Sequence, residues 1–159
     1  LDFWSGRKNP YEIPKQKNEI RIVSCDMAFV ENDNNDNSVF SCIRLLPETT
    51  SYKPDGSNET IVNNGYRRVV SYMEHAQGGE LKAQATRIRE LYEDFQSDYI
   101  CLDTRNSGLG IYDLLARPLY DEDRSIEYPA LTCMNDDALA NRIRVEGAEP
   151  RIFAVNATH

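Results

Sequence analysis

Apolar residues recur along the chain with periods that predict alternating strands and helices. Residues 20–30 carry apolar side chains on both faces of an extended run, which is typical of a strand at the centre of a sheet. The Asn- and Asp-rich turn 31–37 separates this run from a second predicted strand, 38–46, so the two form a hairpin. A long polar loop, 47–65, then leads to a third predicted strand, 66–74.

The second half of the chain switches to helical periods with strands between them. Apolar residues at helical spacing predict a helix over 80–96, and a continuous apolar run predicts a buried parallel strand over 99–103. We expect three further elements, a short helix, a longer helix and a last strand: 111–116, 136–145 and 151–155. The fold class is therefore α/β, with a mixed five-stranded sheet in which three antiparallel strands precede the parallel ones.

Two aspartates stand in apolar, strand-like runs. Asp26 lies within 20–29, and Asp103 ends 99–103. A carboxylate in such a run is costly to bury unless it is paired, hydrogen-bonded or bound to a metal. On neighbouring strands the two would form an oxygen-rich site suited to Mg²⁺ or Mn²⁺ and to two-metal phosphodiester hydrolysis. The alternative is that each aspartate only ends a strand at the surface.

Composition and charge limit the classes of function. The chain has 159 residues, 40% hydrophobic and 28% charged, which fits one globular domain. No apolar run approaches the length of a membrane helix, and no signal peptide is visible. The net charge of −8 argues against a simple nucleic-acid-binding module, which is usually basic, but does not exclude a nuclease.

The four cysteines, Cys25, Cys42, Cys101 and Cys133, form no CxxC pair. Three of them lie in apolar strand-like runs, where a free cysteine behaves as a small hydrophobe. Free cysteines in apolar strands indicate a reducing compartment, and without a CxxC pair they argue against a zinc site.

A glycine-containing turn, 104–110, follows Asp103 and could present backbone N–H groups to a phosphate. It has neither the Rossmann nor the P-loop spacing, and an ordinary strand-to-helix turn is the alternative. Candidate contacts to DNA phosphates are Arg105, Arg67 and Arg68, although the last two point to opposite faces of a strand.

These residues resemble a known family. The run from Asp103, Asp-Thr-Arg-Asn-Ser-Gly-Leu-Gly-Ile-Tyr-Asp-Leu-Leu, looks like the acidic strand end and glycine turn in the nuclease domain of viral terminase large subunits. Ser-Cys-Asp26-Met-Ala, followed by Asn35-Asp36-Asn-Ser-Val, is similar to that family's first acidic strand and following Asp-Ser. The segments 128–135 and 151–159 also look terminase-like, so the resemblance covers most of 20–159.

The resemblance implies a ribonuclease-H-like, Mg²⁺- or Mn²⁺-dependent endonuclease that cuts concatemeric double-stranded viral DNA in the host cytoplasm during packaging. It implies Asp26 and Asp103 as metal ligands, with Asp36 and Asp113 as secondary candidates; Asp113 would otherwise orient the glycine turn. Residues 1–19 would link the nuclease domain, 20–159, to an upstream ATPase domain. The portal and the small terminase subunit would be partners, and no membrane is implied.

One departure from the family concerns the third metal ligand, which usually follows the strand expected at 151–155. We expect this ligand to lie beyond His159; the alternative is that Asp136 or Asp137 takes its place. Without a third ligand we expect cleavage to be impaired. Three alternatives stay open: another nuclease of the same superfamily, such as a resolvase or transposase; an actin-like or sugar-kinase-like nucleotide-binding domain, for which the chain is short; and a non-catalytic interaction domain.

Overall fold

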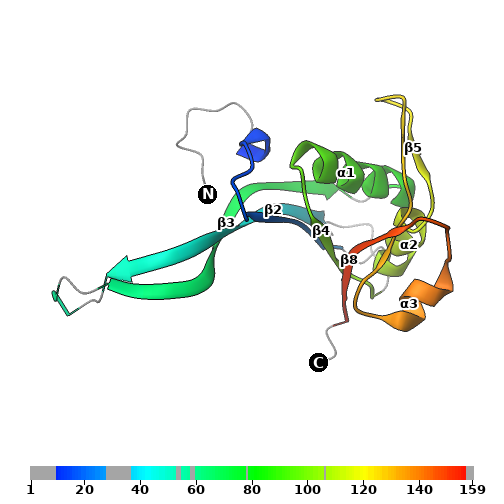
Figure 1. The fold of residues 1–159 in the computed structure, drawn as a ribbon. Helices are drawn as coiled ribbons and strands as arrows, with labels where there is room; N and C mark the ends of the chain where they lie inside the picture. The colour runs from blue at the N-terminus through cyan, green and yellow to red at the C-terminus, as the bar shows by residue number, and fades with distance from the viewer. Residues whose placement is uncertain are drawn as a thin grey trace.

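The structure, a computed structural model, describes residues 10–27, 37–52, 55–57, 60–77, 79–105 and 107–156. Its elements follow one another in the order shown in Figure 1. They are η1 (Pro10–Glu12), β1 (Ile20–Asp26), β2 (Asn37–Tyr52), β3 (Thr60–Gln77), α1 (Leu81–Asp94), β4 (Tyr99–Asp103), α2 (Ser107–Leu115), β5 (Leu119–Asp121), β6 (Ile126–Tyr128), β7 (Leu131–Cys133), α3 (Asp137–Arg142) and β8 (Glu149–Val155).

The fold is α/β and is built on a mixed six-stranded sheet with the strand order β3-β2-β1-β4-β8-β7. The β1–β2 and β2–β3 pairs are antiparallel, whereas β1–β4, β4–β8 and β7–β8 are parallel. The expected order of antiparallel and then parallel strands is confirmed, but the expected count of five is wrong. The extra strand is β7, which is too short to show an alternating pattern in sequence.

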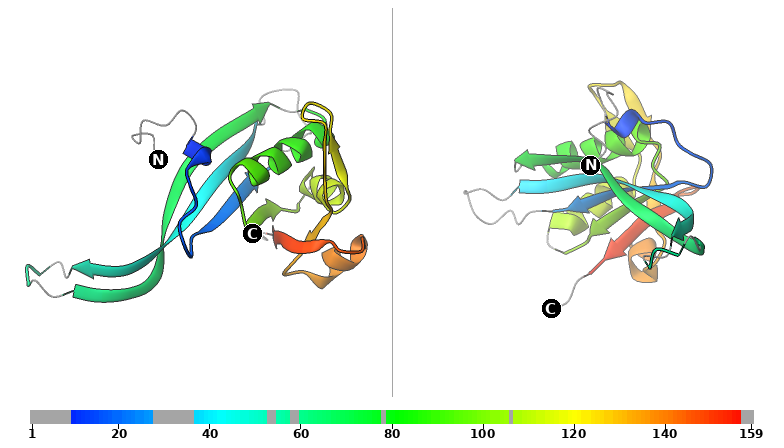
Figure 2. Two further views of the ribbon diagram at one scale, coloured as in Figure 1. Left: turned by 45° about the horizontal axis from the view of Figure 1, so that its top comes forward. Right: turned by 90° about the vertical axis from the view of Figure 1, so that its left-hand side faces the viewer.

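The hydrophobic core lies between one face of the sheet and the helices α1 and α2 (Figure 2). Every second residue of the central strands is buried on this face, as at Val23, Ile100 and Leu102. The α1 side chains Ile88 and Leu91 are fully buried in the same cluster. The helical spacing seen in the sequence is therefore the face of α1 that packs on the sheet.

Along the other face of the sheet, apolar side chains are more exposed. Met73 on β3 is 52% exposed and Phe153 on β8 is 44% exposed. Phe153 is in register with Cys101, which is in register with Ser24, so these side chains lie in one row across the sheet.

Strands β2 and β3 form a long hairpin whose far end projects away from the helices (Figures 1 and 2). Their pairing continues to Tyr52 opposite Thr60, so the expected loop over 47–65 is mostly paired strand. The sequence of that segment is polar and lacks a hydrophobic alternation, since a projecting ribbon has no core to face. That is why its strands could not be recognised from the sequence.

The last two predicted helices differ from the observed ones at their ends. The short helix expected over 111–116 begins earlier, at Ser107, because the glycine turn already belongs to α2. The helix expected over 136–145 is reduced to the single short α3, which Asp136 caps by accepting a hydrogen bond from the Leu139 N–H at 3.1 Å. Ile143, at its other end, is extended.

The packed domain begins before residue 20. Segment 10–19, expected as a lead-in, contains the buried Ile13 and Glu19, and Tyr11 contacts Tyr72 edge to face at 4.9 Å. Within the described part of the chain, no helix is long and apolar enough to cross a membrane.

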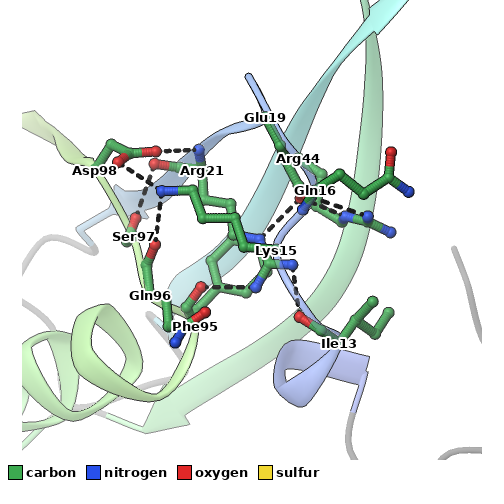
Figure 3. Close-up of polar contacts among 10 residues, drawn as sticks. All are labelled: Ile13, Lys15, Gln16, Glu19, Arg21, Arg44, Phe95, Gln96, Ser97 and Asp98. Carbon is green, nitrogen blue, oxygen red and sulfur yellow. Dashed lines mark hydrogen bonds and ion pairs between the residues drawn. The ribbon is translucent and has the colours of Figure 1, made fainter.

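A buried ionic network holds this segment against the start of β1 (Figure 3). The Glu19 carboxylate accepts hydrogen bonds from Arg21 Nε at 2.8 Å and Arg44 Nε at 2.6 Å. Arg21 also donates to the carbonyl oxygens of Phe95 and Ile13. Because these groups satisfy one another, charges that would be costly to bury alone are tolerated in the interior.

Candidate functional site

Asp26 and Asp103 end two neighbouring parallel strands at the same edge of the sheet. The β1–β4 register runs from Ile22 opposite Tyr99 to Cys25 opposite Leu102, and the two aspartates are the next residues of each strand. Residues in register on parallel strands point to the same face, and neighbouring strands lie about 4.8 Å apart. The topology therefore brings the two predicted site residues together.

The two carboxylates differ in their surroundings. Asp26 is exposed, whereas the Asp103 side chain is 23% exposed and is held by Arg105. Oδ1 of Asp103 accepts hydrogen bonds from the backbone N–H and the Nε of Arg105, both at 3.0 Å. Oδ2 accepts from Nε at 3.1 Å and from Nη2 at 2.5 Å. Both oxygens of Asp103 are thus engaged by a residue two positions further along the chain.

This ion pair fixes the charge state of the site. The hydrogen bonds from Arg105 lower the pKa of Asp103 below its ordinary value, although partial burial opposes the shift. Hydrogen bonding to Asp103 raises the pKa of Arg105, and the negative charge of Asp26 acts in the same direction. Asp103 is therefore ionised at neutral pH, and the Arg105 cation lies in the field of both carboxylates.

Gly108 sets the position of the turn that follows Asp103. A Cβ atom added at Gly108 would overlap the backbone carbonyl oxygen of Asp103, because the first turn of α2 lies directly against the end of β4. The backbone N–H of Gly108 donates to the carbonyl oxygen of Arg105 at 2.9 Å. The glycine that marked the motif in the sequence is thus required by a close backbone approach.

The donor chemistry of this edge fits a divalent cation that prefers oxygen. Mg²⁺ is often held by one or two carboxylates, with waters and substrate phosphate completing its shell. Asp26 and Asp103 place two carboxylates, which are hard oxygen donors, at the ends of neighbouring strands. Among the residues that the structure describes, no group of three or more His, Cys, Asp or Glu side chains is arranged to hold a metal ion.

Asp113, a secondary candidate ligand, contacts a different partner. Its carboxylate accepts hydrogen bonds from Arg142 Nε at 2.7 Å and Nη2 at 2.9 Å, which links α2 to α3. These hydrogen bonds lower the pKa of Asp113. The contact gives Asp113 a structural role between two helices.

The remaining predicted residues lie elsewhere or outside the described ranges. Asp36 lies outside the residues that the structure describes, so its candidacy is a prediction. Arg67 and Arg68 are exposed on β3, paired with Leu46 and Leu45. Asp136 caps α3 and Asp137 lies in its first turn. Neither the two arginines nor the two α3 aspartates make an observed contact that joins them to Asp103.

Sequence reasoning missed the pairing of Arg105 with Asp103, although it named both residues. The available signal was an arginine two positions after a carboxylate at a strand end, just before a glycine turn. Comparisons of the chain with protein-family models, curated proteins and solved structures found no match. The interpretation of the site therefore depends on its residues and their geometry.

Proposed function

We propose that this domain is a divalent-metal-dependent DNA endonuclease of the ribonuclease-H-like superfamily, and specifically the nuclease part of a viral terminase large subunit. The observation that carries the proposal is the placement of Asp26 and Asp103 at the ends of β1 and β4, adjacent and parallel in the sheet. The terminase assignment is narrower and depends on the sequence resemblance around both aspartates.

The sheet topology supports the superfamily. Three antiparallel strands, β1 to β3, are followed by a helix and by β4, which pairs with β1 in parallel. In the ribonuclease-H-like fold the acidic site lies where the first strand and this parallel strand are neighbours, and the two aspartates of this chain stand at that point.

Each residue of the site has a distinct task in the proposed activity. Asp26 and Asp103 would ligate Mg²⁺ or Mn²⁺, which when bound activates water and neutralises charge on the scissile phosphate. Because Gly108 has no side chain, the first turn of α2 can lie directly against the Asp103 carbonyl group and so position the end of β4. Arg105 is exposed at the rim of the site and carries the positive charge suited to a phosphate.

The test is cleavage of supercoiled plasmid DNA by the purified chain with Mg²⁺, with Mn²⁺ and with a chelator. We expect slow cleavage, because only two carboxylates are brought together, with nicked and linear products only in the presence of a divalent ion and their loss in Asp26→Asn and Asp103→Asn. Each substitution keeps the shape of the side chain and removes its charge, so the fold is preserved.

The matched control is Asp113→Asn, because Asp113 is also a partly exposed aspartate paired with an arginine. We expect this variant to cut like the parent chain. Cleavage that survives Asp26→Asn, or that does not need a divalent ion, contradicts the proposed function.

A further inference from the structure

We propose that Arg105 competes with the metal ion for Asp103: its guanidinium neutralises the site in the absence of metal, and a divalent cation displaces it toward a DNA phosphate. This inference rests on the proposed function and adds a regulatory role for a residue of the same site. Binding of the metal ion would then strengthen DNA binding, and DNA binding would strengthen metal binding.

The competition follows from the geometry of the ion pair. Three side-chain hydrogen bonds, at 2.5 to 3.1 Å, place the guanidinium edge against both carboxylate oxygens of Asp103. A cation that ligates Asp103 needs lone pairs of these same oxygens. It would also be repelled by a positive guanidinium within a few ångströms. The metal ion and the Arg105 side chain therefore cannot both hold Asp103 in this arrangement.

Displacement leaves part of the contact in place. The backbone N–H of Arg105 donates to Asp103 Oδ1 at 3.0 Å, and this bond needs no particular side-chain rotamer. It can continue to orient the carboxylate after the guanidinium has left, as hydrogen bonds commonly do for metal ligands. The Arg105 side chain is 40% exposed, so its guanidinium lies at the surface and borders solvent.

The displaced guanidinium remains next to the site because its backbone follows β4 directly. A planar guanidinium binds phosphate through paired N–H donors, as it binds the carboxylate here. DNA brought to Asp26 and Asp103 would place its phosphates within reach of this side chain. The phosphate would then stabilise the displaced position of Arg105, and so favour the metal-bound state.

A second arginine–aspartate ion pair offers an internal comparison. Arg142 and Asp113 form a similar exposed two-bond ion pair on α2 and α3, with Nε–Oδ1 at 2.7 Å and Nη2–Oδ2 at 2.9 Å. Asp113 is not at the end of β1 or β4. Removing Arg142 therefore costs the same kind of surface ion pair without opening the candidate metal site.

The experiment is a calorimetric titration of the chain with Mn²⁺ alone, for the parent, Arg105→Ala, Arg142→Ala and Asp26→Asn. We expect Arg105→Ala to bind Mn²⁺ about twofold to fivefold more tightly, the range that corresponds to losing one exposed competing ion pair. Arg142→Ala should match the parent. Equal or weaker Mn²⁺ binding by Arg105→Ala overturns the competition.

A second readout uses binding of a labelled DNA duplex, followed by fluorescence anisotropy with EDTA and with Ca²⁺. We expect Arg105→Ala to weaken binding more in Ca²⁺ than in EDTA, because the parent guanidinium is free for phosphate only when the cation holds Asp103. An equal effect in both buffers contradicts release of Arg105. Circular dichroism of Arg105→Ala confirms that the variant is folded.

The variants separate this inference from the proposed function. If Asp26→Asn binds Mn²⁺ like the parent while Arg105→Ala binds more tightly, Arg105 competes with the ion for Asp103, but the metal site shared by Asp26 and Asp103 is contradicted. If Asp26→Asn loses Mn²⁺ binding and Arg105→Ala is unchanged, the paired site stands and the competition is wrong. Absence of Mn²⁺ binding in every variant overturns both.

Discussion

Gly108 lies so close to Asp103 that a Cβ atom at this position would overlap the Asp103 carbonyl oxygen. Backbone cannot move aside as a flexible side chain can, so we expect Gly108→Ala to displace the end of β4 or the first turn of α2. The cost should be about 3 kcal/mol in the free energy of unfolding, at the upper end for overpacking. Urea denaturation followed by circular dichroism measures it.

Gly110, in the same helix turn, is the matched control. A Cβ atom there would meet Cδ1 of Leu81 at 2.7 Å and Cγ of the same residue at 4.0 Å, both in one flexible side chain. Alanine also gains about 1 kcal/mol of helix propensity over glycine. We therefore expect Gly110→Ala to lie within about 1 kcal/mol of the parent. If Gly108→Ala and Gly110→Ala lose the same free energy of unfolding, the close approach of Gly108 to the Asp103 carbonyl does not limit the residue at that position.

The buried Glu19 makes stability depend on pH in the acid range. Burial opposes ionisation of this carboxyl, but hydrogen bonds from Arg44 and Arg21 prevail and lower the pKa of Glu19 from 4.5 to about 2. Because the folded-state pKa is the lower one, the stabilisation is complete above about pH 4.5 and is lost as the pH falls toward 2. The shift corresponds to about 3 kcal/mol.

We therefore expect the stability difference between the parent and Glu19→Gln to shrink by about 3 kcal/mol as the pH falls through this range. Urea unfolding at several pH values measures the difference. Glu149→Gln is the control, since Glu149 is 65% exposed in its pair with Arg151 and should contribute less than about 1 kcal/mol at any pH. A parent-to-Glu19→Gln difference that does not change with pH would contradict the assigned ionisation.

The cysteines should differ in reactivity according to their place in the sheet. Cys101 is partly exposed on the face away from α1 and α2, whereas Cys25, Cys42 and Cys133 are buried. Burial raises the pKa of Cys42 to about 12, and it also raises the pKa of Cys101. The thiolate is the reactive form, so exposure rather than acidity should distinguish Cys101.

We expect a disulfide reagent such as DTNB to modify Cys101 first in the native protein, and the other thiols only after unfolding. Mass spectrometry of peptides locates the modified residue. Cys101→Ser should remove the early reaction, whereas Cys133→Ser should leave it unchanged. Early modification of a buried cysteine would contradict the arrangement of the sheet faces.

The sequence was sufficient to predict the part of the fold that places the site. The apolar runs around Asp26 and Asp103 identified β1 and β4 as strands. The expectation that both faces of these strands are buried was wrong, because only every second residue is buried and the side chains between them are partly exposed. Strands β5, β6 and β7 were missed, since three residues give too little of a two-residue period. The projecting hairpin was missed because a ribbon without a core beneath it has no hydrophobic alternation.

The candidate site was predictable only as a set of residues. That Asp26 and Asp103 would be adjacent was implied only by the resemblance to ribonuclease-H-like nucleases, because hydrophobic periodicity does not tell which strands are neighbours in the sheet. That Arg105 would hold Asp103 was not predicted, because a local side-chain rotamer leaves no trace in hydrophobic periodicity. The network of Glu19, Arg21 and Arg44 was missed for a related reason, since a charged residue in sequence is expected to face solvent.

The most direct test of the central claim is a crystal of the domain soaked in Mn²⁺ and measured at the manganese absorption edge. We expect an anomalous peak between the carboxylates of Asp26 and Asp103, with the Arg105 side chain turned away from Asp103. Manganese bound elsewhere, or the two carboxylates more than about 8 Å apart, would contradict a shared metal site, since paired ions in such sites lie about 4 Å apart.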